Sequence, residues 1–178
     1  MTPAWGECLF GGEPTLPPLS RIVSAPAMSV KRDFPDLPPI WMFAHGALAW
    51  VVARWVPLAS FEGGVARAIG TVLIVVGVGL AAWASVHFAK GKTSIEPRER
   101  PRTLLATGPF RVNRNPIYTG MALVLLGWAL WLGTLSALLA IVPFPFIIDR
   151  RFVRSEEAML REVFGKEADI YIAETRRW

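Results

Sequence analysis

Three long runs without a charged side chain limit the fold of this 178-residue chain more than any other feature. They cover residues 37–53, 68–89 and 117–148, with lengths of 17, 22 and 32 residues, and none contains Asp, Glu, Lys or Arg. A bilayer core about 30 Å thick is spanned by roughly 20 apolar helical residues. The runs therefore predict an all-α, polytopic integral membrane protein.

The 32-residue run predicts a helical hairpin. It is too long for one membrane span and short for two, and Gly133 lies at its middle. We therefore expect two short helices, at about 117–132 and 134–148, each roughly 24 Å long. Such a hairpin thins the bilayer or stops short of its far face, and Pro143 and Pro145 each remove a backbone donor from the second arm. The expectation is about four transmembrane segments, the third and fourth less regular than the first two.

The positions of Lys and Arg predict the orientation in the membrane. Residues 90–114 hold seven basic side chains against two glutamates, and the tail from residue 150 onward holds another seven. Both segments are therefore expected on the cytoplasmic side, which with four crossings also places the N-terminus there. This sorting explains the formal net charge of +5 without nucleic-acid binding.

The first 36 residues differ from the rest of the chain. They are rich in proline and contain no apolar run long enough for a signal-peptide core. We expect a disordered or non-native extension over 1–36, with translation starting at Met1 or at Met28, and a membrane domain over 37–178. The single cysteine, Cys8, leaves no intramolecular disulfide and no cysteine-rich metal site, so no metal is predicted.

Two histidines lie in or near the membrane segments. His45 falls in the first run, and His87 lies near the cytoplasmic end of the second. A polar residue inside a membrane segment suggests a functional site, but a lone histidine more often makes a helix–helix hydrogen bond. Both interpretations stay open. The sequence contains no HExxH, Walker loop or GxGxxG motif, so the chemistry does not rest on those devices.

Two polar segments flank the hairpin. The first, GPFRVNRNPIYTG at 108–120, stands directly before it, with Pro116 at the expected first position of the third span. The second is the tail at 151–178, in which Met159, Leu160, Val163 and Phe164 form one apolar helical stripe and Gly165 is a plausible stop. The tail thus predicts an amphipathic cytoplasmic helix, with Glu156 and Glu157 near its positive dipole end.

Together these segments resemble the isoprenylcysteine carboxyl methyltransferase and phospholipid methyltransferase superfamily of integral membrane enzymes. The family blocks Gly-Pro-Tyr-Arg-x-x-Arg-His/Asn-Pro-x-Tyr-x-Gly and Glu-Glu-x-x-Leu-x-x-x-Phe-Gly-x-x-Tyr-x-x-Tyr, the second often ending near Arg-Trp, match over about 93–178. The matching residues are Gly108, Pro109, Arg111, Arg114, Asn115, Pro116, Tyr118, Gly120, Glu156, Glu157, Leu160, Phe164, Gly165, Tyr171, Arg177 and Trp178. Phe110 and Ala168 depart from the tyrosines that are usual there. Asn115 is similar to the bacterial branch, which implies an inner-membrane location and argues against a prenyl-cysteine substrate.

The resemblance implies S-adenosylmethionine as cofactor, bound by residues 93–178 at the cytoplasmic membrane face. Glu156 and Glu157 suit the cationic and hydroxyl groups of the cofactor, and Arg114, with Arg111 as second candidate, suits its carboxylate. Asn115 offers both a donor and an acceptor. The implied cofactor-binding residues are Gly108, Arg111, Arg114, Asn115, Tyr118, Glu156, Glu157 and Tyr171.

The implied reaction is methyl transfer by in-line displacement to a hydrophobic or lipid-like acceptor. Alignment and exclusion of water supply most of the catalysis in such a reaction, and the candidate catalytic residues are Arg114, Asn115, Tyr118 and Glu157. A carboxylate or thiolate acceptor needs no general base. An amine acceptor needs one, for which Glu157, Tyr118 and His87 are candidates. The acceptor is expected to enter from lipid, between the second span and the hairpin.

Two other classes of protein are alternatives to a methyltransferase. Membrane sterol reductases carry a related C-terminal block and bind NADPH, although they are larger. A non-enzymatic membrane scaffold is the other alternative. The sequence also leaves the oligomeric state open, because Gly70, Gly77 and Gly79 permit close helix packing within one protomer or between two.

Overall fold

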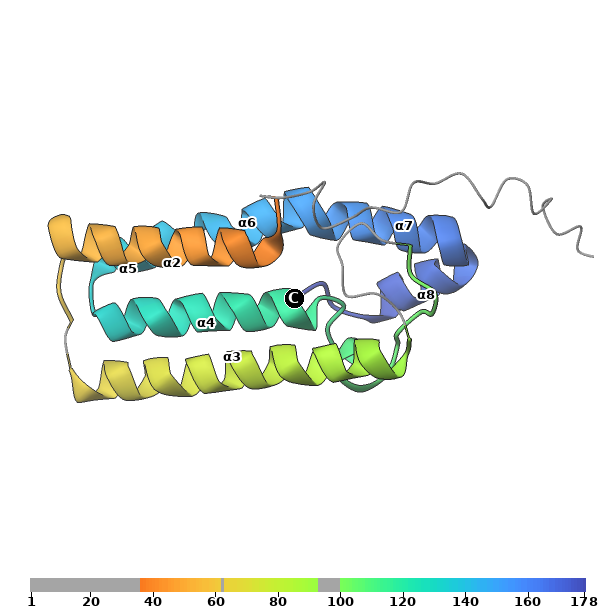
Figure 1. The fold of residues 1–178 in the computed structure, drawn as a ribbon, viewed down its shortest axis with the longest axis horizontal. Helices are drawn as coiled ribbons and strands as arrows, with labels where there is room; N and C mark the ends of the chain where they lie inside the picture. Colours follow the sequence, from red (N-terminus) through yellow and green to blue (C-terminus); the bar gives the residue numbers. More distant parts are fainter. Residues whose placement is uncertain (1–35, 62, 93–99) are drawn as a thin grey trace, which may run out of the picture.

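The computed structural model describes residues 36–61, 63–92 and 100–178, and over this part the chain is all-helical, as expected. Figure 1 shows α2 (Pro38–Trp55), α4 (Pro116–Leu132) and α3 (Gly64–Lys90) side by side along the length of the molecule. The short helices α5 (Leu135–Ile141) and α6 (Pro143–Ile148) run beside α2. The expectations for residues 1–35, including Cys8 and the start at Met28, lie outside the described residues.

Helices α3 and α4 touch backbone to backbone. A Cβ atom added at Gly70 would stand 2.6 Å from the carbonyl oxygen of Gly127, and one added at Gly77 would stand 2.5 Å from that of Gly120. Small residues permit such close approach between membrane helices. The glycines of the second span therefore pack within the protomer, except Gly79, which has open space beside it.

The turn between the hairpin arms forms where the sequence predicts it. Gly133 ends α4 in the left-handed conformation, with φ +67°, which favours glycine. The Thr134 side chain accepts a hydrogen bond from the Ala137 amide at 3.3 Å and caps α5. The loop between α2 and α3 stabilises the turn at Gly133, because the Phe61 amide donates a hydrogen bond to the Gly133 carbonyl at 2.8 Å.

The arms of the hairpin differ in regularity. The second arm is broken into α5 and α6 before Pro143 and continues into a widened π turn, Asp149–Val153 (η3). The first arm was expected to be irregular too, and this is wrong: α4 is one uninterrupted helix. The reason is that its proline, Pro116, occupies the first helical position, where the missing donor has no intrahelical partner.

The helix α7 (Arg154–Phe164) continues directly from this second arm. Val153 and Arg154 both have right-handed helical dihedral angles, so the helix continues from η3 into α7 without interruption. Glu156 and Glu157 therefore do not face a free helix N-terminus, and the expected dipole interaction is wrong. As predicted, α7 ends at Gly165, and α8 (Lys166–Glu174) folds back beneath it (Figure 1).

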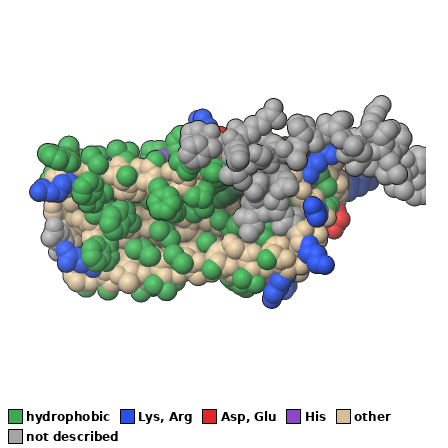
Figure 2. Space-filling view, viewed as in Figure 1, with side chains coloured by type: hydrophobic (Ala, Val, Ile, Leu, Met, Phe, Trp, Pro, Cys, Tyr) green, Lys and Arg blue, Asp and Glu red, His purple; other side chains and the backbone are tan. Residues whose placement is uncertain are grey.

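The outer surface is apolar along the helices and basic at both ends. Among the described residues, α3 is long and apolar enough to cross a membrane, with 27 residues, and α4 is a shorter apolar helix. Most of α3 is exposed rather than buried in a protein core, including Val72, Val75 and Val76. Figure 2 shows hydrophobic side chains over the helices and Lys and Arg at the two ends. A surface of this kind suits contact with lipid.

Candidate functional site

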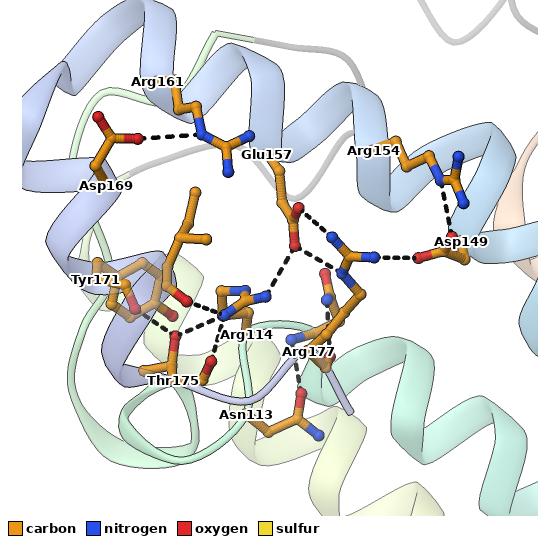
Figure 3. A network of polar contacts seen from close by, with 12 residues as sticks. Asn113, Arg114, Asp149, Arg154, Glu157, Arg161, Asp169, Tyr171, Thr175 and Arg177 are labelled. Carbon is orange, nitrogen blue, oxygen red and sulfur yellow. Dashed lines mark hydrogen bonds and ion pairs between the residues drawn. The ribbon is translucent and has the colours of Figure 1, made fainter.

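The C-terminus folds back onto the polar segment that precedes α4. The Arg114 amide donates to the Arg176 carbonyl at 2.8 Å, and the Arg176 amide donates to the Val112 carbonyl at 3.2 Å. These bonds form a short parallel bridge between Asn113 and Arg176. The last residues of the chain therefore lie beside the start of the third span (Figure 3).

Arg114 lies at the centre of the polar network in Figure 3. Its side chain is only 9% exposed, and its Nη2 donates to Glu157 Oε1 at 3.1 Å. Its Nη1 donates to the carbonyl oxygens of Ile172, at 2.5 Å, and Thr175. Its Nε is buried and has no acceptor within the described part of the chain. Arg114 thus ties three segments together and keeps one donor unused.

Glu157 is 5% exposed and binds a second arginine. Arg177 donates from Nε to Oε1 at 2.9 Å and from Nη2 to Oε2 at 2.6 Å. Its Nη1 also donates to Asp149 at 3.2 Å. The hydrogen bonds from Arg177 to Glu157 raise the pKa of this guanidinium above its ordinary value, so it stays a cation. Arg154 also binds Asp149 at 2.9 Å, so three arginines share two carboxylates. The most buried charges, Arg114 and Glu157, are paired with each other, as buried charges require.

The π turn brings the two carboxylates onto one face of the helix. Asp149 and Glu157 are eight residues apart, which on a regular helix separates them by about 80° around the axis. A π turn adds one residue to a helical turn. The pair is therefore equivalent to residues seven apart on a regular helix, which do share a face. This explains how Arg177 reaches both side chains.

The expected acidic pair divides between two partners. Glu157 faces the arginines, whereas Glu156 accepts a hydrogen bond from the Tyr118 hydroxyl at 2.5 Å. Tyr118 is buried on the first turn of α4, where the sequence predicts it. Asn115, also buried, donates from Nδ2 to the Arg177 carbonyl at 2.9 Å.

The remaining candidate residues lie around the loop before α4. The buried Tyr171 hydroxyl donates to the Phe110 carbonyl at 2.9 Å, and burial raises the pKa of Tyr171 to about 12 despite the opposing charge of Arg114. Gly108 has φ +60°, and a Cβ there would stand 2.2 Å from His87 Nε2. Arg111 is exposed and makes no ion pair with another described residue.

Both histidines donate to the carbonyl four residues earlier in their own helix. His45 Nδ1 bonds Trp41 at 2.8 Å, and the ring meets Phe144 of α6 edge-on at 5.6 Å. His87 Nδ1 bonds Trp83 at 3.0 Å. The hydrogen bond of His45 therefore lies within its own helix and does not join two helices, and only its ring contacts another helix. His87 lies against the loop at Gly108.

The structure thus brings Arg114, Asn115 and Glu157 together and pairs Tyr118 with Glu156. Asp149, Thr175 and the contacts of Arg177 were not predicted from the sequence. Asp149 is the first charge after the long uncharged run, which is a usable signal. Arg177 was matched to the family tail, but the sequence has no feature that predicts its fold-back onto residues 112–114.

Comparison with known proteins gives one family. The family described as phospholipid methyltransferase (PEMT) matches residues 65–167, more than half of the chain. A curated protein of Haemophilus influenzae, described as "Uncharacterized protein", is 37% identical over 62 residues, which is 35% of this chain and 98% of that protein. No solved structure matches the chain.

Proposed function

The chain belongs to the phospholipid methyltransferase family, and from this premise we propose that it transfers a methyl group from S-adenosylmethionine to a hydrophobic or lipid-like acceptor. The matched residues 65–167 include the polar segment before α4 and both glutamates of α7. Membership favours methyl transfer over the reduction catalysed by NADPH-dependent sterol reductases and over a non-enzymatic scaffold.

The observation that carries this proposal is the contact between Arg114 and Glu157. The two residues are 43 positions apart and come from the two separate motifs of the family resemblance. An arginine and a carboxylate at the end of the membrane helices are the charges that an amino-acid-bearing nucleotide requires. A purely structural ion pair has no need of the second arginine and the tyrosine–glutamate pair beside it.

The donors and acceptors present fit the cofactor. The buried Nε of Arg114 is a ready donor for a carboxylate. A carboxylate offers about four acceptor positions, of which Glu157 uses three on its arginines. The fourth position and the Glu156 carboxylate suit an ammonium or ribose hydroxyl groups. When bound, S-adenosylmethionine would supply an electrophilic methyl group on a sulfonium.

The residues of the chain contribute position and shielding in this proposal. Arg114 and Asn115 hold the C-terminal segment over Glu157, which keeps water away from the charged groups. The Tyr118 hydroxyl, on the first turn of α4, and Glu156 would meet an acceptor that arrives from lipid. For an amine acceptor, the Tyr118–Glu156 pair is the nearest group able to take a proton. Arg111 remains a second candidate for the cofactor carboxylate.

The proposed architecture is one membrane domain over 37–178, with cofactor binding in 93–178. We propose four crossings, by α2, α3, α4 and the α5–α6 arm, with both termini in the cytoplasm of a bacterial cell and the protein at the inner membrane. The basic loop after α3 and the basic tail meet at the same end of the molecule, which supports this orientation. The ion pair between Arg100 and Glu162 is one contact between them. At the opposite end, Arg67 lies over the Trp131 ring, as an interfacial anchor does.

Incorporation of labelled methyl groups tests the function. Membranes containing the protein are incubated with methyl-labelled S-adenosylmethionine, and the labelled species in the lipid and protein fractions are identified. We expect wild type and Glu162→Gln to label one lipophilic species, and Glu157→Gln and Glu156→Gln to lose that labelling. Glu162 is the matched control, because it lies on the same helix in an exposed ion pair. Equal labelling by all four proteins would refute the site.

A further inference from the structure

An apolar groove lies on the lipid-facing surface between α2, α3 and α4. Its volume is about 530 Å³, within the roughly 300–1,000 Å³ range of small-molecule sites. All the residues that line it are apolar, and they include Phe43, Gly46 and Ala47 of α2, Ile74 of α3, and Leu125 and Trp128 of α4. Figure 2 shows hydrophobic side chains gathered over these helices.

The packing of the helices keeps this groove open. α3 is fixed to α4 by the glycine contacts, while α2 packs on α4 and α5. The Trp128 Nε1 donates to the Gly46 carbonyl at 3.1 Å, so the indole is held beside the groove. Because Gly46 has no side chain, the wall of α2 recedes at this point. α2 and α3 are thus fixed on either side of the groove.

The groove leads toward the candidate site. Leu125 lines the groove and also packs in the buried cluster that contains Tyr118 and Phe152. Tyr118 and Leu125 are seven residues apart on α4, which is roughly 10 Å along the helix axis. Met42 also lines the groove and packs against the same cluster. A molecule whose polar end lies at Tyr118 would therefore need an apolar part about 10 Å long to reach the groove.

The close packing limits the expected entry route between the second span and the hairpin, because α3 and α4 are in contact at their glycines. Between α3 and α4, the carbonyl oxygens of Gly120 and Gly127 approach the partner glycines too closely for any ligand to pass. An acceptor arriving from lipid meets the open surface between α2 and α3 instead.

We propose that this groove binds a single hydrocarbon chain of the lipid acceptor, with the polar head of the acceptor at Tyr118 and Glu156. This inference rests on the proposed methyl transfer and locates the apolar part of its acceptor in the fold. The occupant is a lipid chain rather than a protein segment, because the lining offers neither a charge nor a row of polar groups to a partner. Its location facing the bilayer gives lipid chains the highest local concentration of any candidate.

A photoreactive lipid tests the groove. Purified protein in nanodiscs receives increasing amounts of phosphatidylethanolamine with a diazirine on one palmitoyl chain, and cross-linked peptides are identified by mass spectrometry. We expect labelling of groove residues to saturate and to fall when unlabelled phosphatidylethanolamine is added. Labelling of Val72, Val75 and Val76, which lie outside the groove on the exposed surface of α3, should rise in proportion to the probe. Proportional labelling at both places would show bulk lipid only and overturn the proposal.

A matched pair of substitutions gives a second test. Ala47→Phe fills the groove, whereas Ala44→Phe adds the same side chain at an exposed position of α2 outside it. Ala47→Phe should abolish saturable labelling and raise the KM for the acceptor without changing S-adenosylmethionine affinity, and Ala44→Phe should behave as wild type. Equal behaviour of the two variants, or cross-links that join two copies through the groove, would contradict it. Wild type that binds the lipid saturably but does not bind S-adenosylmethionine would refute the methyltransferase proposal instead.

Discussion

At the level of single residues, Arg114 and Arg177 bind the same carboxylate but differ in burial. The Arg114 side chain is 9% exposed and also holds two carbonyl oxygens of the tail, whereas that of Arg177 is 39% exposed. Loss of one partner of a buried pair costs about 3–5 kcal/mol, and loss of a partly exposed pair costs about 1 kcal/mol or less. Arg114 is therefore the structural centre of the site.

We predict that Arg114→Ala lowers the free energy of unfolding by about 3 kcal/mol, and that Arg177→Ala lowers it by about 1 kcal/mol. After the second substitution Glu157 still has Arg114 as partner. Reversible unfolding in mixed detergent micelles measures both values, with Arg161→Ala as an exposed control. Equal losses for Arg114→Ala and Arg177→Ala would mean that burial does not set the strength of these pairs.

Tyr171 gives a prediction about pH. The pKa of about 12, against 10.0 in the unfolded chain, means that the folded protein keeps the hydroxyl proton of Tyr171 to a higher pH. The stabilisation of the folded protein by the protonated Tyr171 hydroxyl is complete below pH 10 and is lost as pH rises from 10 toward 12. Thermal unfolding at pH 8 and pH 11 should show a larger drop in Tm for wild type than for Tyr171→Phe. The same drop in Tm for both proteins would mean that this hydroxyl does not contribute to the pH dependence of stability.

At the level of elements, the glycines of α3 are not equivalent. Gly77 faces the backbone of α4, whereas Gly79 has no neighbour within 4 Å of an added Cβ. We predict that Gly77→Ala separates α3 from α4 and destabilises the protein, because the Gly120 carbonyl is fixed in its own helix. Gly79→Ala should be neutral or stabilising by up to about 1 kcal/mol, as expected from helix propensity. Unfolding measurements in detergent that rank the two variants in the opposite order would contradict the glycine contact.

The elements also show what the sequence could and could not predict. The uncharged runs predicted the helices, Gly133 the turn, and Gly165 the end of α7, because each of these depends on local residue types. The continuous path from α6 through η3 into α7 was missed. An acidic pair after a membrane exit has the same composition whether a helix starts there or continues, and a π turn has no sequence signature.

The candidate site was predictable only in part for a similar reason. The closeness of Arg114 and Glu157 followed from the family resemblance and not from spacing, since 43 residues separate them. The contribution of Arg177 depends on backbone pairing between the chain end and residues 112–114. Such pairing is decided by tertiary structure, which single-sequence patterns do not contain.

For the whole molecule, the orientation in the membrane gives a prediction. In a Cys8→Ser background, Ser60→Cys in the loop between α2 and α3 should react with a membrane-impermeant maleimide in intact cells. Lys166→Cys on α8 should react only after the inner membrane is permeabilised. Both positions are exposed, so burial does not explain a difference. Labelling with the opposite pattern would reverse the proposed topology.

The most direct test of the account is the affinity of the purified protein for S-adenosylmethionine and its demethylated product, measured by isothermal titration. We expect saturable binding to wild type and to Glu162→Gln. Binding to Glu157→Gln and Glu156→Gln should be at least roughly tenfold weaker, because each loses a charged hydrogen-bond acceptor. No binding to folded wild type, or equal affinity in all four proteins, would contradict the assignment of this ion-pair network as the cofactor site.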